Sequence, residues 1–151
     1  MCDIDMPSPT EQALLPVMRR FNDAFLRPER FGWRDAYALA AMTWGPSRGL
    51  AIAHAVQDFL AALMTSRPVP LRLADPAASI KPLGPDEQAV LRLLRAMQAD
   101  EAPAARDEIA LLTQGRIEAA VIRTGLELAA KLDPMLPMTP DRDRPALEVV
   151  I

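Results

Sequence analysis

Apolar residues recur along this chain at spacings of three and four, the spacing that lines one face of an α-helix, rather than in the alternation typical of strands. Thr10 is the expected N-cap of the first helix. Pro16 falls inside that helix, so it either kinks it or lies in the first turn of a restarted one. The pattern predicts an all-α protein. The first apolar stripe contains Leu14, Val17, Met18, Phe21, Ala24 and Phe25.

Prolines and glycines divide the rest of the chain into further helical stretches. Arg27-Pro28 ends the first helix, and Gly45-Pro46 separates the second from the third. Gly115 is expected to be a left-handed C-terminal cap of the fifth helix. We therefore expect a single-domain bundle of five to six helices. After the first, they are expected at about 33–44, 46–65, 85–99, 103–112 and 116–132, and the core face of the third carries Ile52, Val56, Phe59, Leu60 and Leu63.

Residues 67–85 contain five prolines and are expected to form an ordered, mostly non-helical crossover loop. Such a connector joins distant helices or carries a binding surface. Its apolar residues indicate that it packs against the helices. The sequence thus divides into a flexible N-terminus over 1–9, a helical domain over 10–132 and an extended or disordered tail over 133–151.

The tail contains the apolar, β-branched segment Leu147–Ile151. Such a segment can dock into a groove, within the chain or across a dimer, or add to a partner as an extended strand. The alternative is a frayed terminus.

The composition removes several classes of function. A single histidine, His54, and a single cysteine, Cys2, exclude a structural zinc cluster and an internal disulfide. No cofactor fingerprint is visible, so neither a cofactor nor a metal is expected. The longest stretch without Asp, Glu, Lys or Arg is residues 36–47, shorter than the roughly 20 residues of a membrane span. The acidic start, with Asp3 and Asp5, lacks a secretory signal, so a cytoplasmic protein with no membrane partner is expected.

The formal charge of −3 supplies no positive field for a phosphate backbone, which disfavours nucleic acid as a partner. The chain contains fifteen arginines and two lysines. This excess indicates either forked recognition of carboxylates and phosphates or the codon usage of a GC-rich genome. Arg92 and Arg95 fall opposite the apolar stripe of their helix, which predicts that they are solvated.

The segment Trp44–Gly49 is the first candidate site. Ser47 and Arg48 lie at an expected helix start, where free N–H groups and the helix dipole favour anions. Trp33, Arg34 and Trp44 could add aromatic walls and a second cation to a carboxylate or phosphate site. The alternative is an ordinary turn between helices.

His54 and Asp58 are one helical turn apart, as a general base and its orienting carboxylate would be. Both fall away from the core stripe, so a surface pair is the simpler interpretation. Arg48 and His54 are separated by five residues, which resembles the ribonuclease motif of the HEPN family of helical proteins. The likeness covers two residues, Gly49 stands where that family has a polar residue, and the acidic charge disfavours RNA.

Glu118 falls inside the apolar arc of the expected sixth helix, beside Gly125 and Ala129. A buried carboxylate must be paired, hydrogen-bonded or neutral. We therefore expect a buried Glu–Arg pair or, alternatively, a ligand-binding or catalytic acid. The short junction over 112–116 superficially suggests a helix-turn-helix, but the helix that follows is poor in side chains that reach bases.

Together these features lean towards a non-enzymatic, cytoplasmic protein-interaction or regulatory module that acts as a homodimer or binds another protein. Its expected interface anchors are Trp33, Tyr37, Trp44 and Arg48. The alternative hypothesis is a small-anion-binding bundle or weak hydrolytic enzyme. That site would be built from Ser47, Arg48, His54, Asp58 and Glu118.

Overall fold

The computed structural model describes residues 6–80 and 82–132, and these residues form six α-helices, one short 3-10 helix and no strand. The all-α prediction is confirmed. Predictions for residues 1–5 and for the segment 133–151 lie outside the described residues. The elements are α1 (Pro9–Leu26), η1 (Pro28–Arg30), α2 (Gly32–Trp44), α3 (Pro46–Ser66), α4 (Pro85–Gln98), α5 (Ala102–Thr113) and α6 (Ala119–Lys131).

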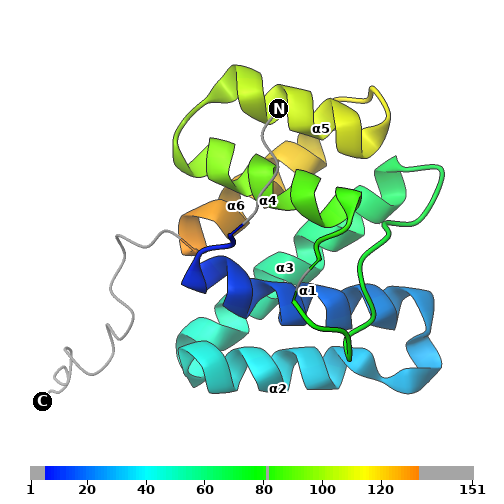
Figure 1. Cartoon of the computed structure of the whole chain (residues 1–151), viewed down its shortest axis with the longest axis vertical. Coiled ribbons are helices and arrows are strands. Elements are labelled where there is room, and N and C mark those ends of the chain that lie inside the picture. Colours follow the sequence, from blue (N-terminus) through cyan, green and yellow to red (C-terminus); the bar gives the residue numbers. More distant parts are fainter. Residues whose placement is uncertain (1–5, 81, 133–151) are drawn as a thin grey trace, which may run out of the picture.

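Helix α3 joins two groups of helices into one bundle (Figure 1). It packs against α1 and α2 on one side and against α6 on the other, while α4 packs against α5 and α6. All five predicted core positions of α3 are buried. Its length and apolar composition would also allow it to cross a membrane, which is weak evidence because half of its most apolar window is buried inside the bundle.

Helix α1 begins earlier than the sequence predicted. Ser8, not Thr10, is the N-cap. The Glu11 N–H donates to the Ser8 Oγ at 3.2 Å, and the Ser8 N–H donates to the Glu11 Oε1 at 2.8 Å, which forms a capping box. The helix continues through Pro16 without a break. Phe25, expected on the buried stripe, is exposed because the stripe reaches solvent at the end of the helix.

The close approach of α2 and α3 depends on a glycine. A Cβ added at Gly49 would lie 2.3 Å from the Ala40 carbonyl oxygen, so only glycine fits there. Gly45, in the turn between the helices, has a φ of +90°, a region that other residues avoid. The two glycines of the predicted anion site, Gly45 and Gly49, are therefore explained by the turn and by the close packing of the helices.

The fifth and sixth helices are joined by a left-handed turn. Gln114 is the C-cap of α5 with a φ of 58°, and Gly115 follows with a φ of +94°. The Gly115 N–H donates to the Ala110 carbonyl at 2.7 Å. The left-handed glycine was predicted, although the cap itself is one residue earlier. Helix α6 then begins at Ala119, three residues later than expected.

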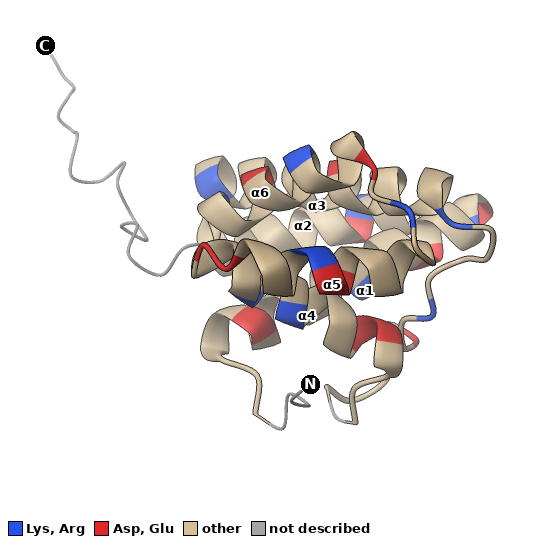
Figure 2. Cartoon of the chain, turned by 90° about the horizontal axis from the view of Figure 1, so that it is seen from above, with Lys and Arg blue, Asp and Glu red and all other residues tan. Residues whose placement is uncertain are grey.

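The connector, residues 67–84, contains no helix or strand among its described residues and crosses α1 between the end of α3 and the start of α4 (Figure 1). Leu71 of the connector is buried against the helices, which agrees with the predicted packing. Helices and connector carry interspersed acidic and basic residues, with no face of one sign in the view of Figure 2.

The prediction that Arg92 and Arg95 are solvated is wrong for Arg92, whose side chain is 15% exposed, whereas Arg95 is exposed as predicted, and both are paired with carboxylates. The Arg92 Nε lies 3.0 Å from the Glu108 Oε2, and the Arg95 Nη2 lies 2.6 Å from the Glu11 Oε1. Arg19 is buried outright. The helical stripe of α4 correctly separates apolar from polar positions, but it cannot show that a neighbouring helix supplies a carboxylate.

Candidate functional site

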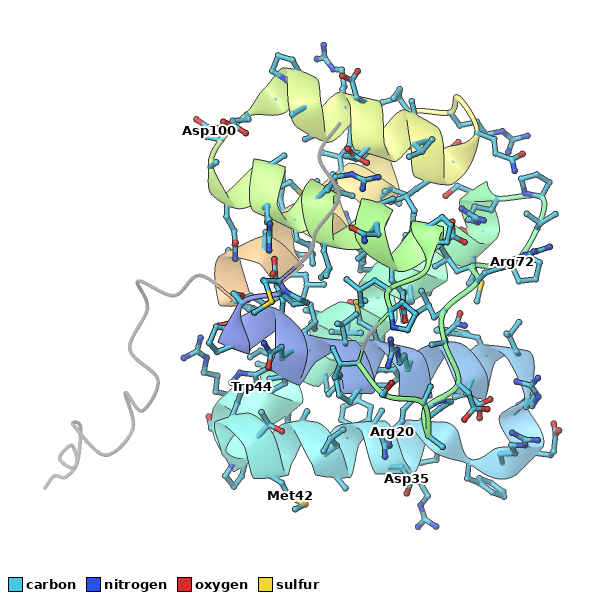
Figure 3. The ribbon with its side chains drawn as sticks, in the orientation of Figure 1. Arg20, Asp35, Met42, Trp44, Arg72 and Asp100 are labelled. Carbon is cyan, nitrogen blue, oxygen red and sulfur yellow. The ribbon has the colours of Figure 1, made fainter. Side chains whose placement is uncertain are left out.

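The two tryptophans of the first candidate site lie at opposite ends of α2, roughly 16 Å apart along the helix axis. Trp33 is about half exposed, and the Arg34 guanidinium lies 5.9 Å from its ring centroid. Trp44 is buried and lies at the far side of the molecule from Arg72 (Figure 3). The tryptophans therefore do not form one aromatic wall.

Ser47 is exposed in the first turn of α3, whereas Arg48 is partly buried. The Arg48 Nη2 donates to the Lys131 carbonyl at 3.1 Å. A cation at this end of α6 offsets the negative end of the helix dipole and satisfies a carbonyl that has no partner within the helix. Arg48 thus links the start of α3 to the end of α6.

His54 and Asp58 form the predicted surface pair. The His54 Nδ1 lies 3.5 Å from the Asp58 Oδ2, and their side chains are 68% and 48% exposed. His54 is six residues after Arg48, which turns it about 240° around the helix axis. The two residues of the HEPN-like spacing therefore face different directions.

The prediction that Glu118 is buried is wrong. Glu118 is the N-cap of α6, has an extended backbone and is exposed. The helical projection failed because the chain is not helical from 116 to 118. The space beside Gly125 is filled by Met97, whose Cε would lie 2.9 Å from an added Cβ. No carboxylate or ligand is needed there.

A different site lies beneath the connector. A cavity of about 520 Å³ opens between the second half of α1 and residues 69–76. This volume is in the range of small-ligand pockets. Its apolar lining comes from both walls: Leu26, Val69, Leu71 and Leu73. Its polar lining includes Arg19, Asn22, Asp23, Arg27, Arg72 and Asp75.

A buried ion pair between Arg19 and Glu87 fixes the connector at this cavity. The Arg19 Nε donates to the Glu87 Oε2 at 2.7 Å, and Nη2 donates to Oε1 at 3.1 Å. Arg19 also donates to the carbonyls of Ser79 and Ile80 at 3.0 and 3.1 Å. One arginine of α1 is thereby bonded to both the connector and α4.

The Glu87 carboxylate accepts hydrogen bonds from three residues. Besides Arg19, it accepts the N–H groups of Ala74 at 3.1 Å and Gly84 at 3.2 Å. Burial alone would raise its pKa, but these hydrogen bonds and the Arg19 charge hold the pKa of Glu87 below its ordinary value. Glu87 is therefore an ionised acceptor at neutral pH.

The neighbouring carboxylate, Asp86, holds the other half of the connector. Its Oδ2 accepts the Arg72 N–H at 2.8 Å and lies 3.4 Å from the Arg67 Nη2. Asp86 and Glu87 lie in the first turn of α4, where carboxylates are favoured by the helix dipole. In the structure they also bind the backbone of the connector.

Asn22 gives the cavity an unused acceptor. Its Nδ2 donates to the Leu71 carbonyl at 3.4 Å, while its buried Oδ1 has no hydrogen-bond partner among the described residues. Leaving such an atom unpaired costs about 1–3 kcal/mol. Beside it, Asp23 is bonded to Arg27 at 2.8 Å. The cavity thus combines an apolar wall, one unmet acceptor and exposed arginines.

The sequence carried a signal for this site that the helical pattern alone did not reveal. Leu15, Arg19 and Asn22 follow the spacing of one face of α1, so two polar residues continue a face that begins with a buried leucine. Elsewhere, the described residues contain no group of three His, Cys, Asp or Glu side chains that could hold a metal ion.

Comparisons with family models, with curated proteins and with solved structures found no match for this chain.

Proposed function

We propose that this chain is a non-enzymatic protein-interaction module that pairs with a second copy of itself through the turn between α1 and α2. Four large apolar side chains are exposed in one stretch of nine residues around this turn, and this group carries the proposal. We call the surface the corner. It comprises Phe25, Leu26, Phe31 and Trp33 with Arg27, Arg30 and Arg34.

Aromatic and arginine side chains are enriched at the centre of protein interfaces because they bury a large area and also form directed polar contacts. Other large exposed apolar residues are dispersed over the fold, for example Met42 on α2 and Leu50 on α3. Scattered residues of this kind are normal on a protein surface. The corner differs because its four apolar members lie within nine residues of sequence around one turn.

The backbone of the corner supports the same proposal. Phe31 has a φ of 54°, a left-handed conformation that is costly for a bulky residue, and its side chain is 58% exposed. Residues held in such strained conformations cluster at functional sites. Here the strain projects an aromatic ring into solvent.

Among the anchors expected from sequence, Trp33 is available to a partner. Trp44 is buried, which corrects its assignment as an interface anchor. Tyr37 is half-buried and donates its hydroxyl to the Gln57 Oε1 at 2.7 Å. The small-anion alternative has no favouring observation, because Arg48, His54 and Glu118 do not converge on one site.

The association is tested by analytical ultracentrifugation of Trp33→Asp over a range of micromolar concentrations. Placing a carboxylate in a desolvated interface is expected to weaken the dimer by at least about tenfold, or about 1.4 kcal/mol. Met42→Asp is the matched control, since Met42 is 83% exposed and points away from the body of the bundle (Figure 3). A monomeric wild-type chain, or equal effects of both variants, would contradict the proposal.

Phe31→Gly separates association from folding. Glycine accepts the left-handed backbone, so the free energy of unfolding of the dissociated chain is expected to rise by about 1 kcal/mol. Loss of the ring should weaken the dimer at the same time. Denaturant unfolding at low protein concentration and ultracentrifugation measure the two effects. A variant that is less stable and equally dimeric would contradict the role given to Phe31.

A further inference from the structure

Helix α6 carries a row of apolar residues on the side that faces away from the bundle core. Its four members follow each other at spacings of three and four and so share one face of the helix: Ala119, Ile122, Leu126 and Ala130. Leu126 is 48% exposed, Ile122 is partly buried, and both alanines are exposed. A helix of a globular protein normally turns its apolar stripe towards the core. This row is therefore an accessible apolar surface.

Part of the row lines a groove between α6 and the pair formed by α4 and α5. The groove has a volume of about 230 Å³ and is lined by Ile122 and Leu126 from α6, by Met97 from α4 and by Ile109 from α5. Ile109 is buried, so Met97, Ile122 and Leu126 supply the accessible apolar contacts. Pockets that enclose a small ligand hold roughly 300–1,000 Å³. The smaller groove is suited to a few apolar side chains.

The turn between α4 and α5 also lines the groove, and its N–H groups are already used. The Asp100 N–H donates to the Met97 carbonyl at 3.2 Å. The Glu101 N–H donates to the Ala96 carbonyl at 2.8 Å. Asp100 lies at this turn in Figure 3. An added strand needs free backbone partners, so the groove favours an occupant that has few N–H groups of its own.

The chain contains such an occupant directly after α6. Residues 134–138 read Pro-Met-Leu-Pro-Met. The two prolines have no N–H group and hold their φ angles in the extended range, so few hydrogen bonds are lost when the segment meets an apolar surface. The leucine and the two methionines supply apolar side chains, and methionine adapts to irregular surfaces.

The segment is close enough to reach the groove. Leu126 lies six residues before Leu132, about 9 Å back along the axis of α6. Measured from Leu132, Leu136 extends to at most about 14 Å and Met138 to at most about 21 Å. A chain that turns back after Leu132 thus brings these side chains to Leu126. So short a connection gives an effective concentration on the order of millimolar, which favours the same chain over a second copy.

The other apolar segment of the tail, Leu147–Ile151, is less suited to this groove. It contains no proline and keeps an N–H group at every residue. Covering these groups without partners costs free energy.

We propose that residues 134–138 fold back and dock in the groove between α6 and the α4–α5 pair of the same chain, where they cover Ile122 and Leu126. The proposal does not rest on the corner, because no residue that lines the groove belongs to the corner.

Methionine oxidation in the full chain tests the proposal. Met135 and Met138 are expected to react with dilute hydrogen peroxide more slowly than Met42, which is 83% exposed. Leu126→Asp places a charge in the groove and should raise both rates to that of Met42. Leu50→Asp is the matched control, since Leu50 is also 48% exposed but lies on α3. Mass spectrometry measures the three rates in one sample.

Equal oxidation of the three methionines in the wild type, or equal effects of the two variants, would overturn the proposal. Protection that fades on dilution would overturn it as well, because it would assign the groove to a second copy. Trp33→Asp should leave the protection unchanged whether or not the corner mediates association. Loss of protection in Trp33→Asp would also contradict docking within one chain.

A substitution in the tail provides the reciprocal test and does not alter the helices themselves. Leu136→Asp should shift the methyl resonances of Ile122 and Leu126 in the full chain. Val149→Asp adds the same charge to the other apolar segment and should leave these resonances in place. If only Val149→Asp moved them, the groove would belong to Leu147–Ile151 and the proposal would be overturned. Resonances that respond to neither variant would overturn it too.

Discussion

The contact between α2 and α3 and the contact between the connector and the helices are held by different chemistry. At the first contact, Gly49 lies against the backbone of Ala40, and the interface is formed by small residues in close contact. At the second, the Arg19–Glu87 ion pair and a set of side-chain-to-backbone hydrogen bonds hold a chain without regular structure. Close packing is destabilised by an added atom. The polar contacts of Arg19 and Glu87 with the connector, which we call the clamp, are destabilised by the loss of either partner.

Removing one member of the buried pair is expected to have the largest effect. Arg19→Met leaves the Glu87 carboxylate buried without its cation, which should lower the free energy of unfolding by about 3–5 kcal/mol. Denaturant unfolding measures the change. The double variant Arg19→Met/Glu87→Leu removes both charges and should recover much of the loss. If the single variant were as stable as wild type, the clamp would not hold the connector.

Gly49→Ala tests the packed contact and should have the next largest effect. The added methyl meets the Ala40 carbonyl oxygen at 2.3 Å, so α2 and α3 must move apart. A cost of about 1–3 kcal/mol is expected, as for other overpacked sites. Gly84→Ala is the control, since its Cβ would meet only the Arg72 carbonyl oxygen, at an ordinary 3.8 Å. Thermal unfolding that ranks the two variants equally would contradict this account.

Acid should weaken the clamp gradually, with the smallest effect of the three. Because the folded-state pKa of Glu87 is below its ordinary value of 4.5, its stabilisation is complete above about pH 4.5 and is lost as the pH falls through the folded-state pKa. The stability difference between wild type and Glu87→Gln should therefore narrow below pH 4.5. Denaturant unfolding from neutral pH to about pH 3 measures it. A constant difference would contradict this assignment of Glu87.

The comparison also explains which parts of the structure the sequence could predict. Helices α2 and α3 begin and end within one residue of their expected limits, because proline and glycine act locally. The N-caps of α1 and α6, Ser8 and Glu118, were not predicted, since several nearby residues can occupy the N-cap position of a helix. The Arg19–Glu87 pair could not be predicted, because its partners are 68 residues apart and no helical period relates them.

The separation of Arg19 and Glu87 also bears on the order in which the protein folds. Helices α1, α2 and α3 are joined by short turns, as are α4 and α5, so these contacts close small loops at little entropic cost. The ion pair closes a loop of 68 residues. We therefore expect the connector to dock late in folding, after the local helix pairs, and to open first under mild denaturant. A protease would then cut within residues 67–84 while the helices around α3 still hold together.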